Sequence, residues 1–158
     1  MAWEWRSAGR QCPCVRASGA GAHVGPSPAH SSHRVTDLSF RAAVGLQGHA
    51  GLEWDLLGCD DAELRSVRAY GALYRELRDL LHSGTVIHPD DVDPALRVRG
   101  VVAHDRSQAL WTVAAVAQPE ESLADRLRLP GLDPDRRYTV QVRNDVGAPR
   151  TEWAPRAG

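Results

Sequence analysis

The clearest pattern in the chain is an apolar stripe with helical spacing between residues 60 and 84. Apolar residues recur there at steps of three and four, which is the period of one face of an α-helix. Asp60 and Glu63 have the spacing of a capping box, and Gly84 is typical of a helix C-terminus. The sequence therefore predicts an amphipathic helix of about six turns. Its apolar positions are Leu64, Val67, Tyr70, Leu73, Tyr74, Leu77, Leu80 and Leu81.

From residue 85 onward the apolar pattern changes to a period of two, which is the spacing of β-strands. Short alternating segments separated by turn-forming residues predict an antiparallel sheet. We expect turns at residues 104–107 and 130–135, the second as a hairpin loop. The second strand is apolar enough to be buried on both faces. The four strands are predicted at residues 96–102, 109–117, 126–129 and 137–143.

The N-terminal part predicts a short strand, a loop and a second helix. Residues 22–24 have the composition of a strand end, and two closely spaced prolines after them indicate a loop. Thr36 or Asp37 is suited to cap a helix that runs to about His49, with residues 50–58 as a connector. Residues 1–20 show no period of either kind, so we expect them to form a disordered leader.

Composition and charge argue against a nucleic-acid-binding or membrane-binding protein. The 158 residues carry a net charge of −1, and hydrophobic residues make up 42%. All 19 basic residues are arginines, but acidic residues are mixed among them, so no basic face predicts nucleic-acid or membrane binding. The absence of lysine is typical of a GC-rich genome. Neither an apolar membrane-spanning run nor a secretory signal pattern is present, so we expect a cytoplasmic protein.

No complete catalytic constellation emerges from the residues alone. The acidic pairs lie in predicted caps and turns, where capping and turn formation account for them. Neither a glycine-rich phosphate loop nor a Gly-x-Ser-x-Gly motif is present. The three cysteines form no disulfide framework, since their number is odd.

Several motifs nevertheless resemble, in order and spacing, the C-terminal part of the microbial α-galactosidases of glycoside hydrolase family 36, in an actinobacterial-like form. The resemblance covers roughly residues 21–147. Two departures stand out: Ser32-His33 where a Thr-Gly-like pair is expected, and Ala50 where an aromatic residue is usual. The matching stretches are residues 21–30, 34–36, 38–44, 48–49, 51–56, 73–75, 78–84, 88–90 and 126–138.

The resemblance implies a fold of the α/β plus all-β class. It comprises the last βα unit of a TIM (β/α)8 barrel, a further helix, and an antiparallel C-terminal β-sandwich. The implied domains are an out-of-family leader at 1–20, the end of the barrel at 21–84, and a truncated sandwich at 85–158. The one barrel strand that we can identify has no predicted neighbour, so its edges would be exposed.

The family chemistry implied is hydrolysis of terminal α-D-galactosyl residues from oligosaccharides such as melibiose or raffinose, with retention of configuration. Both catalytic carboxylates of the family lie upstream of the motif that holds His23, so we assign no catalytic residue here and expect this chain alone to be inactive. His23, Ser27 and His30 are the substrate-lining candidates. The resemblance implies no cofactor or metal. A galactosyl oligosaccharide is the expected partner of the full-length enzyme, for which the resemblance also allows an oligomer.

Two other functions stay open at this point. A non-catalytic carbohydrate-binding or interaction module would use exposed aromatic rings, and the candidates are Trp54, Trp111, Tyr138 and Trp153. A small metal-binding protein would combine cysteines with nearby histidines, although the spacing fits no zinc class well. The candidates for that site are Cys12, Cys14, His23, His30 and His33.

Overall fold

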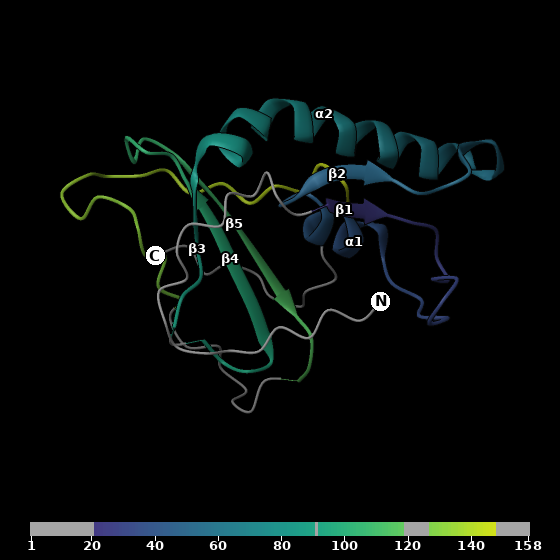
Figure 1. The fold of residues 1–158 in the computed structure, drawn as a ribbon, viewed down its shortest axis with the longest axis horizontal. Coiled ribbons are helices and arrows are strands. Elements are labelled where there is room, and N and C mark those ends of the chain that lie inside the picture. The colour runs from purple at the N-terminus through teal and green to yellow at the C-terminus, as the bar shows by residue number, and fades with distance from the viewer. Residues whose placement is uncertain (1–20, 91, 119–126, 148–158) are drawn as a thin grey trace.

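The computed structural model describes residues 21–90, 92–118 and 127–147. These residues form a mixed α/β structure with two sheets and two main helices (Figure 1). One sheet has two parallel strands, and the other has three antiparallel strands in the order β3-β4-β5. In Figure 1, the long helix α2 runs along the top of the molecule, over the parallel strands. No helix in the described part of the chain is long and apolar enough to cross a membrane.

The parallel sheet is a β-α-β unit in which helix α1 (Leu38–Gly45) connects strand β1 (Gly21–Val24) to strand β2 (His49–Leu52). The strands pair in register from Gly21 with His49 to Val24 with Leu52. The predicted strand at 22–24 and the cap at Asp37 are confirmed, since the Asp37 side chain accepts from the backbone of Ser39.

Three expectations for this region are wrong. The identified strand does have a neighbour, β2 lies where a connector was predicted, and α1 ends at Gly45 rather than near His49. Helix α1 lies close to its neighbours at Gly45, where a Cβ atom would be 2.8 Å from Val24 Cγ2 and 3.1 Å from the Tyr70 hydroxyl. Strand β2 has only four residues, too few for alternation to reveal it.

The predicted long helix is confirmed as α2 (Asp61–Ser83), which has 23 residues. The Asp60 carboxylate accepts from the Glu63 backbone at 2.8 Å, and the Glu63 carboxylate accepts from the Asp60 backbone at 3.0 Å. Gly84 ends the helix as expected, but with φ −71°, outside the left-handed region. Glycine is needed there for space, because a Cβ atom would lie 2.6 Å from Val101 Cγ1 and 2.7 Å from the Leu80 carbonyl oxygen. A short 3-10 turn, η2 (Leu56–Gly58), precedes α2.

The antiparallel sheet contains β3 (Thr85–Ile87), β4 (Leu96–Val102) and β5 (Ala109–Ala115). The predicted strands at 96–102 and 109–117 are thereby confirmed in outline, as is the turn at 104–107. The expectation that the second strand is buried on both faces is wrong. Within the described residues β5 pairs only with β4, and only Ala114 in it is buried, while Val113 is 49% exposed.

Residues 127–147 contain no strand, so the strands predicted at 126–129 and 137–143 are wrong for the residues described. Their alternation is typical of a strand, but strand formation also needs a partner backbone, which sequence alternation cannot supply. Side chains anchor this segment instead. The Tyr138 hydroxyl donates to the Arg106 carbonyl at 2.7 Å, and Arg143 donates two hydrogen bonds to Glu76 on α2, at 2.7 and 2.8 Å. The turn predicted at residues 130–135 is present, with Gly131 at φ +89°, but the expectation that it is a hairpin loop is wrong, because no strand flanks it in the described residues.

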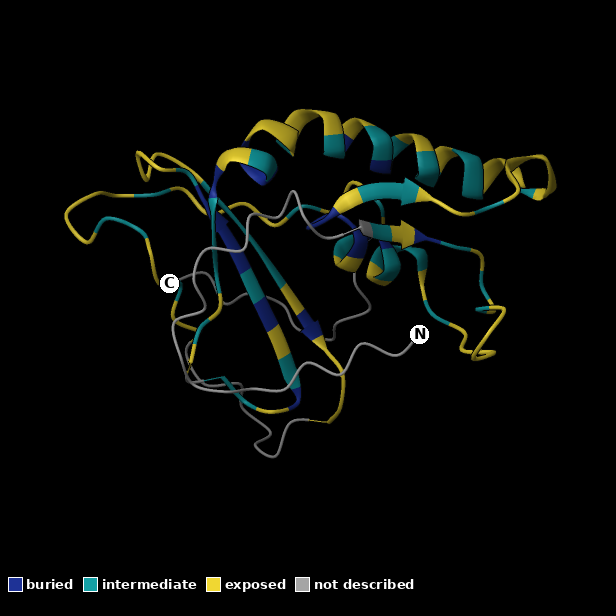
Figure 2. Ribbon diagram, in the orientation of Figure 1, coloured by how far each residue is buried: buried dark blue, intermediate teal, exposed yellow. Residues whose placement is uncertain are grey.

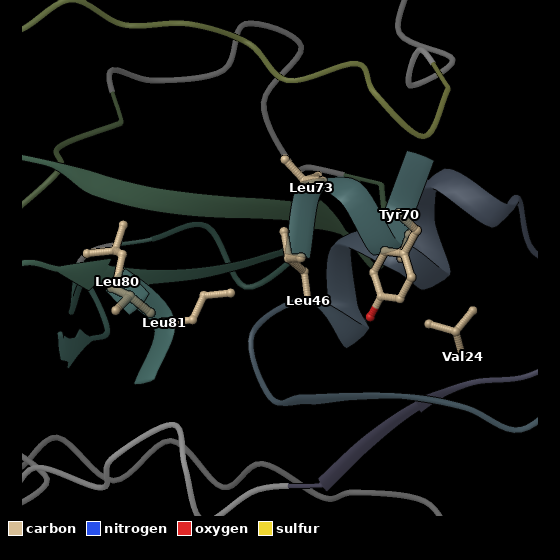
Figure 3. Packing of buried hydrophobic residues seen from close by; sticks show 8 residues of the cluster. Val24, Leu46, Tyr70, Leu73, Leu80 and Leu81 are labelled. Carbon is tan, nitrogen blue, oxygen red and sulfur yellow. The ribbon is translucent and has the colours of Figure 1, made fainter. Parts of the chain in front are cut away.

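The core lies where both helices meet the two sheets (Figure 2). Figure 3 shows Tyr70 of α2 beside Leu46 and Val24, with Leu80 and Leu81 further along the same helix. Val101 of β4 is fully buried and belongs to the same cluster, so α2 packs on the antiparallel sheet as well. A single buried cluster therefore ties the β-α-β unit to the antiparallel sheet. Its buried members are Val24, Ala42, Leu46, Tyr70, Leu73, Leu80, Leu81 and Val101.

Candidate functional site

The candidate site is the edge where β1 and β2 end. Because the two strands are parallel and in register, their carboxyl ends reach the same edge of the sheet. The pairing continues one step past β2, where the Glu53 backbone N–H donates to the Val24 carbonyl at 3.0 Å. Residues that follow β1 and residues that follow β2 are thus neighbours here, although they are far apart in the sequence.

His23 is at this edge, as the second-last residue of β1, and its side chain lies beside a carboxylate. Its Nδ1 atom lies 3.7 Å from Glu53 Oε2, and the two side chains are 62% and 81% exposed. An ion pair this exposed contributes little to the stability of the fold, so it matters here only because it shows that the two side chains share this edge. The His23 ring also lies against Gly51, where a Cβ atom would be 2.3 Å from the ring Cδ2. Sequence reasoning missed Glu53 as a neighbour of His23, because only the strand register brings them together.

Ser27 is half-buried and closes the loop after β1. Its hydroxyl oxygen accepts from the Thr36 backbone N–H at 3.2 Å, just before the start of α1. His30 is exposed in the loop tip, where the Ala29 N–H donates to the Arg34 carbonyl at 2.9 Å. Among the contacts described, none joins His23, Ser27 and His30 to one another. Their role as substrate-lining residues therefore stays a prediction.

Arg41, on α1, is a residue at this edge that sequence reasoning did not single out. Its guanidinium donates to the Gly25 carbonyl and lies over the Trp54 ring, 5.1 Å from the ring centre. Burial lowers the pKa of Arg41, while the charges of Asp37 and Glu63 act in the opposite direction. An arginine side chain stays protonated in proteins, so one cation contacts the loop after β1 and the loop after β2.

Trp111 and Tyr138, two of the aromatic candidates, lie away from this edge. The Trp111 ring covers Gly100, where a Cβ atom would be 2.6 Å from it, and the Tyr138 hydroxyl is bonded within the loop region. Trp153, Cys12 and Cys14 lie outside the described residues. Within the described ranges no group of three or more His, Cys, Asp or Glu side chains could hold a metal ion.

A shallow hollow of about 240 Å³ lies on the antiparallel sheet rather than at the β1–β2 edge. No carboxylate lines it, and none of its lining residues belongs to the candidate site. We therefore place the candidate site by strand geometry and not by this hollow. Its lining residues are Thr85, Ile87, Val102, Ala103, His104, Arg106 and Gly131.

Comparison with known families gives two matches in sequence order. Residues 12–84 match the melibiase family, and residues 96–152 match the glycosyl hydrolase family 36 C-terminal domain. The chain belongs to glycoside hydrolase family 36. The resemblance seen in the sequence is thereby confirmed over most of the chain.

Relatives in this family are α-galactosidases. The Escherichia coli α-galactosidase is 39% identical over 122 residues, which cover 77% of this chain and 17% of that protein. The Lactobacillus acidophilus α-galactosidase Mel36A is 29% identical over 73% of this chain and 16% of its own length. The present chain therefore spans about one sixth of the length of these curated relatives.

Solved structures of the same family share the fold. The α-galactosidase AgaA of Geobacillus stearothermophilus is 31% identical, with a TM-score of 0.68, over 74% of this chain and 16% of its own. The galactosidase domain of the α-galactosidase–sucrose kinase AgaSK gives a TM-score of 0.69 at 27% identity, over 75% of this chain and 17% of that one. Variants of AgaA have been solved in complex with stachyose and with raffinose.

Proposed function

We propose that this chain forms the C-terminal part of a retaining α-galactosidase, which releases terminal α-D-galactosyl residues from oligosaccharides such as melibiose or raffinose. The observation that carries the proposal is the parallel pairing of β1 with β2 through α1, followed by α2. A β-α-β-α series of this kind is the repeating unit of a (β/α)8 barrel. Barrel enzymes hold their active sites at the carboxyl ends of the strands, which is the edge where His23 lies.

The domain assignment follows from the same observation. We assign residues 21–84 to the end of the barrel, now as two βα units instead of one, and residues 85–158 to the C-terminal β-sandwich. The three-stranded antiparallel sheet supports the second assignment as one layer of such a sandwich. The melibiase match begins at residue 12, so we propose only residues 1–11 as a leader outside the family, and we propose the cytoplasm as the location.

Hydrolysis with retention needs two carboxylates on opposite sides of the sugar ring, about 5 Å apart. At the β1–β2 edge the structure has one exposed carboxylate close to His23, that of Glu53. The family resemblance assigns both catalytic carboxylates to positions upstream of His23. We therefore propose that this chain contributes binding groups, with His23, Ser27 and His30 facing the sugar, and no catalytic carboxylate.

Fragment complementation tests this proposal. An Escherichia coli α-galactosidase shortened by the 122 residues that match this chain is co-expressed with the full chain, and hydrolysis of an aryl α-galactoside is measured. We expect no turnover from either polypeptide alone and turnover from the pair. Turnover by the purified chain alone, or none from a soluble, folded pair, would overturn the proposal.

Two glycine variants of this chain make the test specific to the β1–β2 edge. Gly51→Ala places a methyl group 2.3 Å from the His23 ring, whereas Gly71→Ala on α2 meets nothing within 4 Å. We expect G51A to lower the restored activity and G71A to leave it unchanged. Equal activity of the two variants would contradict a role for this edge.

A further inference from the structure

We infer that Arg41 is the positioning residue of the loop at residues 25–36, which carries Ser27 and His30 at the carboxyl edge of β1. The inference rests on the proposed function for its catalytic consequence and on the geometry of Arg41 for its structural part. Arg41 is on α1, so it holds the loop from the helix that follows it.

The first step is the contact at the beginning of the loop. The guanidinium of Arg41 donates to the carbonyl of Gly25, the first residue after β1. Hydrogen bonds from a charged donor are stronger than neutral ones, so this contact restrains the direction in which the loop leaves the strand. The end of the loop is restrained separately, where the Thr36 N–H donates to the Ser27 hydroxyl oxygen at 3.2 Å.

The second step is the aromatic ring that fixes the guanidinium itself. The Arg41 guanidinium carbon lies 5.1 Å from the centre of the Trp54 ring, within the range of a cation–π contact. Trp54 follows β2, so the orientation of the loop after β1 depends on a residue of the loop after the neighbouring strand. A planar guanidinium suits both contacts at once, which the ammonium of lysine does not.

The third step is burial, which separates Arg41 from the exposed arginines of this chain. Its Nε atom is buried with no hydrogen-bond partner among the described residues, and burial lowers the pKa of the side chain. Keeping a charged group partly buried costs stability unless its contacts offset that cost. The hydrogen bond and the cation–π contact of the guanidinium are both to loops at the candidate site, which favours a positioning role over general stabilisation.

The first experiment uses the full chain in solution. In NMR spectra we expect the ring current of Trp54 to shift the Arg41 Nε–Hε signal upfield, and Trp54→Leu to remove that shift. Trypsin cleaves after Arg34, an exposed residue of the loop, and we expect about tenfold faster cleavage there in Arg41→Lys, because an ammonium does not keep both the hydrogen bond to Gly25 and the contact with the Trp54 ring. Arg68→Lys, an exposed position on α2, is the matched control and is expected to cleave at the wild-type rate.

The second experiment uses the complemented enzyme. We expect Arg41→Lys to raise KM for raffinose several-fold with little change in kcat, and Arg68→Lys to change neither. Failure of complementation by the wild-type chain would overturn the proposed function, and with it the catalytic part of this inference. An unshifted wild-type Arg41 signal, wild-type cleavage in R41K, or an unchanged KM would each overturn the positioning role itself.

Discussion

Replacing Gly84 by alanine tests how tightly α2 is joined to the antiparallel sheet. The added Cβ would lie 2.6 Å from Val101 Cγ1, 2.7 Å from the Leu80 carbonyl oxygen and 2.9 Å from the Val102 carbonyl oxygen. Two of these atoms are backbone, and Val101 is fully buried, so none of the three can move away without disturbing the core. The backbone angle of Gly84 suits alanine, so any destabilisation comes from crowding and not from conformation.

Overpacking of this kind typically costs about 1–3 kcal/mol. The matched control is Gly71→Ala in the interior of α2, where a Cβ meets nothing within 4 Å. Alanine is favoured over glycine inside a helix by about 0.5–1 kcal/mol, so G71A is expected to be more stable than the wild type. The two variants should therefore differ by roughly 1.5–4 kcal/mol, although each adds a single methyl group.

Urea denaturation followed by circular dichroism at the helix band measures both changes. With a slope of about 2 kcal/mol per M, G84A should unfold at a midpoint roughly 0.5–1.5 M lower than the wild type, and G71A slightly higher. A G84A midpoint equal to that of the wild type would refute the close approach of α2 to β4. A G71A midpoint below the wild type would refute the open surroundings of Gly71.

Three further outcomes follow from single side chains. Asp60→Ala removes one half of the capping box and should lower the free energy of unfolding by about 1 kcal/mol, while Glu63→Gln should lower it less. Thermal unfolding measures both changes, and a D60A variant as stable as the wild type would contradict the capping box. Gln47 is 2% exposed and donates to the Arg99 carbonyl, so Gln47→Ala should cost about 1–3 kcal/mol in urea unfolding, and a neutral result would contradict that contact. Burial, and then the charge of Arg99, lowers the pKa of His88, so the neutral ring stabilises the fold fully above about pH 6.5 and this stabilisation is lost as the pH falls toward the folded pKa. The free energy of unfolding, measured from pH 8 to 5, should therefore vary less with pH in His88→Gln than in the wild type. Parallel curves for the two proteins would contradict the shift.

Local signals in the sequence predicted local structure well. The stripe and capping box of α2, the Asp37 cap of α1, and the β4–β5 hairpin with its turn all depend on residues close together in the chain. The β1–β2 pair could not be predicted in this way, since four-residue strands carry no clear period and their pairing is non-local. The alternation at residues 137–143 was misleading for the same reason, because a strand forms only where a partner backbone is available.

Some residues of the candidate site could be found from the sequence, and others only from the fold. The family motifs pointed to His23, Ser27 and His30 through short stretches of sequence. Glu53 and Arg41 enter only through the fold, because strand register brings Glu53 to His23 and the packing of α1 brings Arg41 to Gly25. Neither contact leaves a signal in residue spacing.

The parallel pairing of β1 with β2 underlies both the proposed function and the role of Arg41. NMR measurement of cross-strand proton contacts in the full chain tests it most directly. The structure predicts contacts between Ala22 and Ala50 and between His23 and Gly51, with a slowly exchanging Glu53 amide bonded to the Val24 carbonyl. Absence of these contacts in the folded chain, or contacts with the reversed register of an antiparallel pair, would contradict the account.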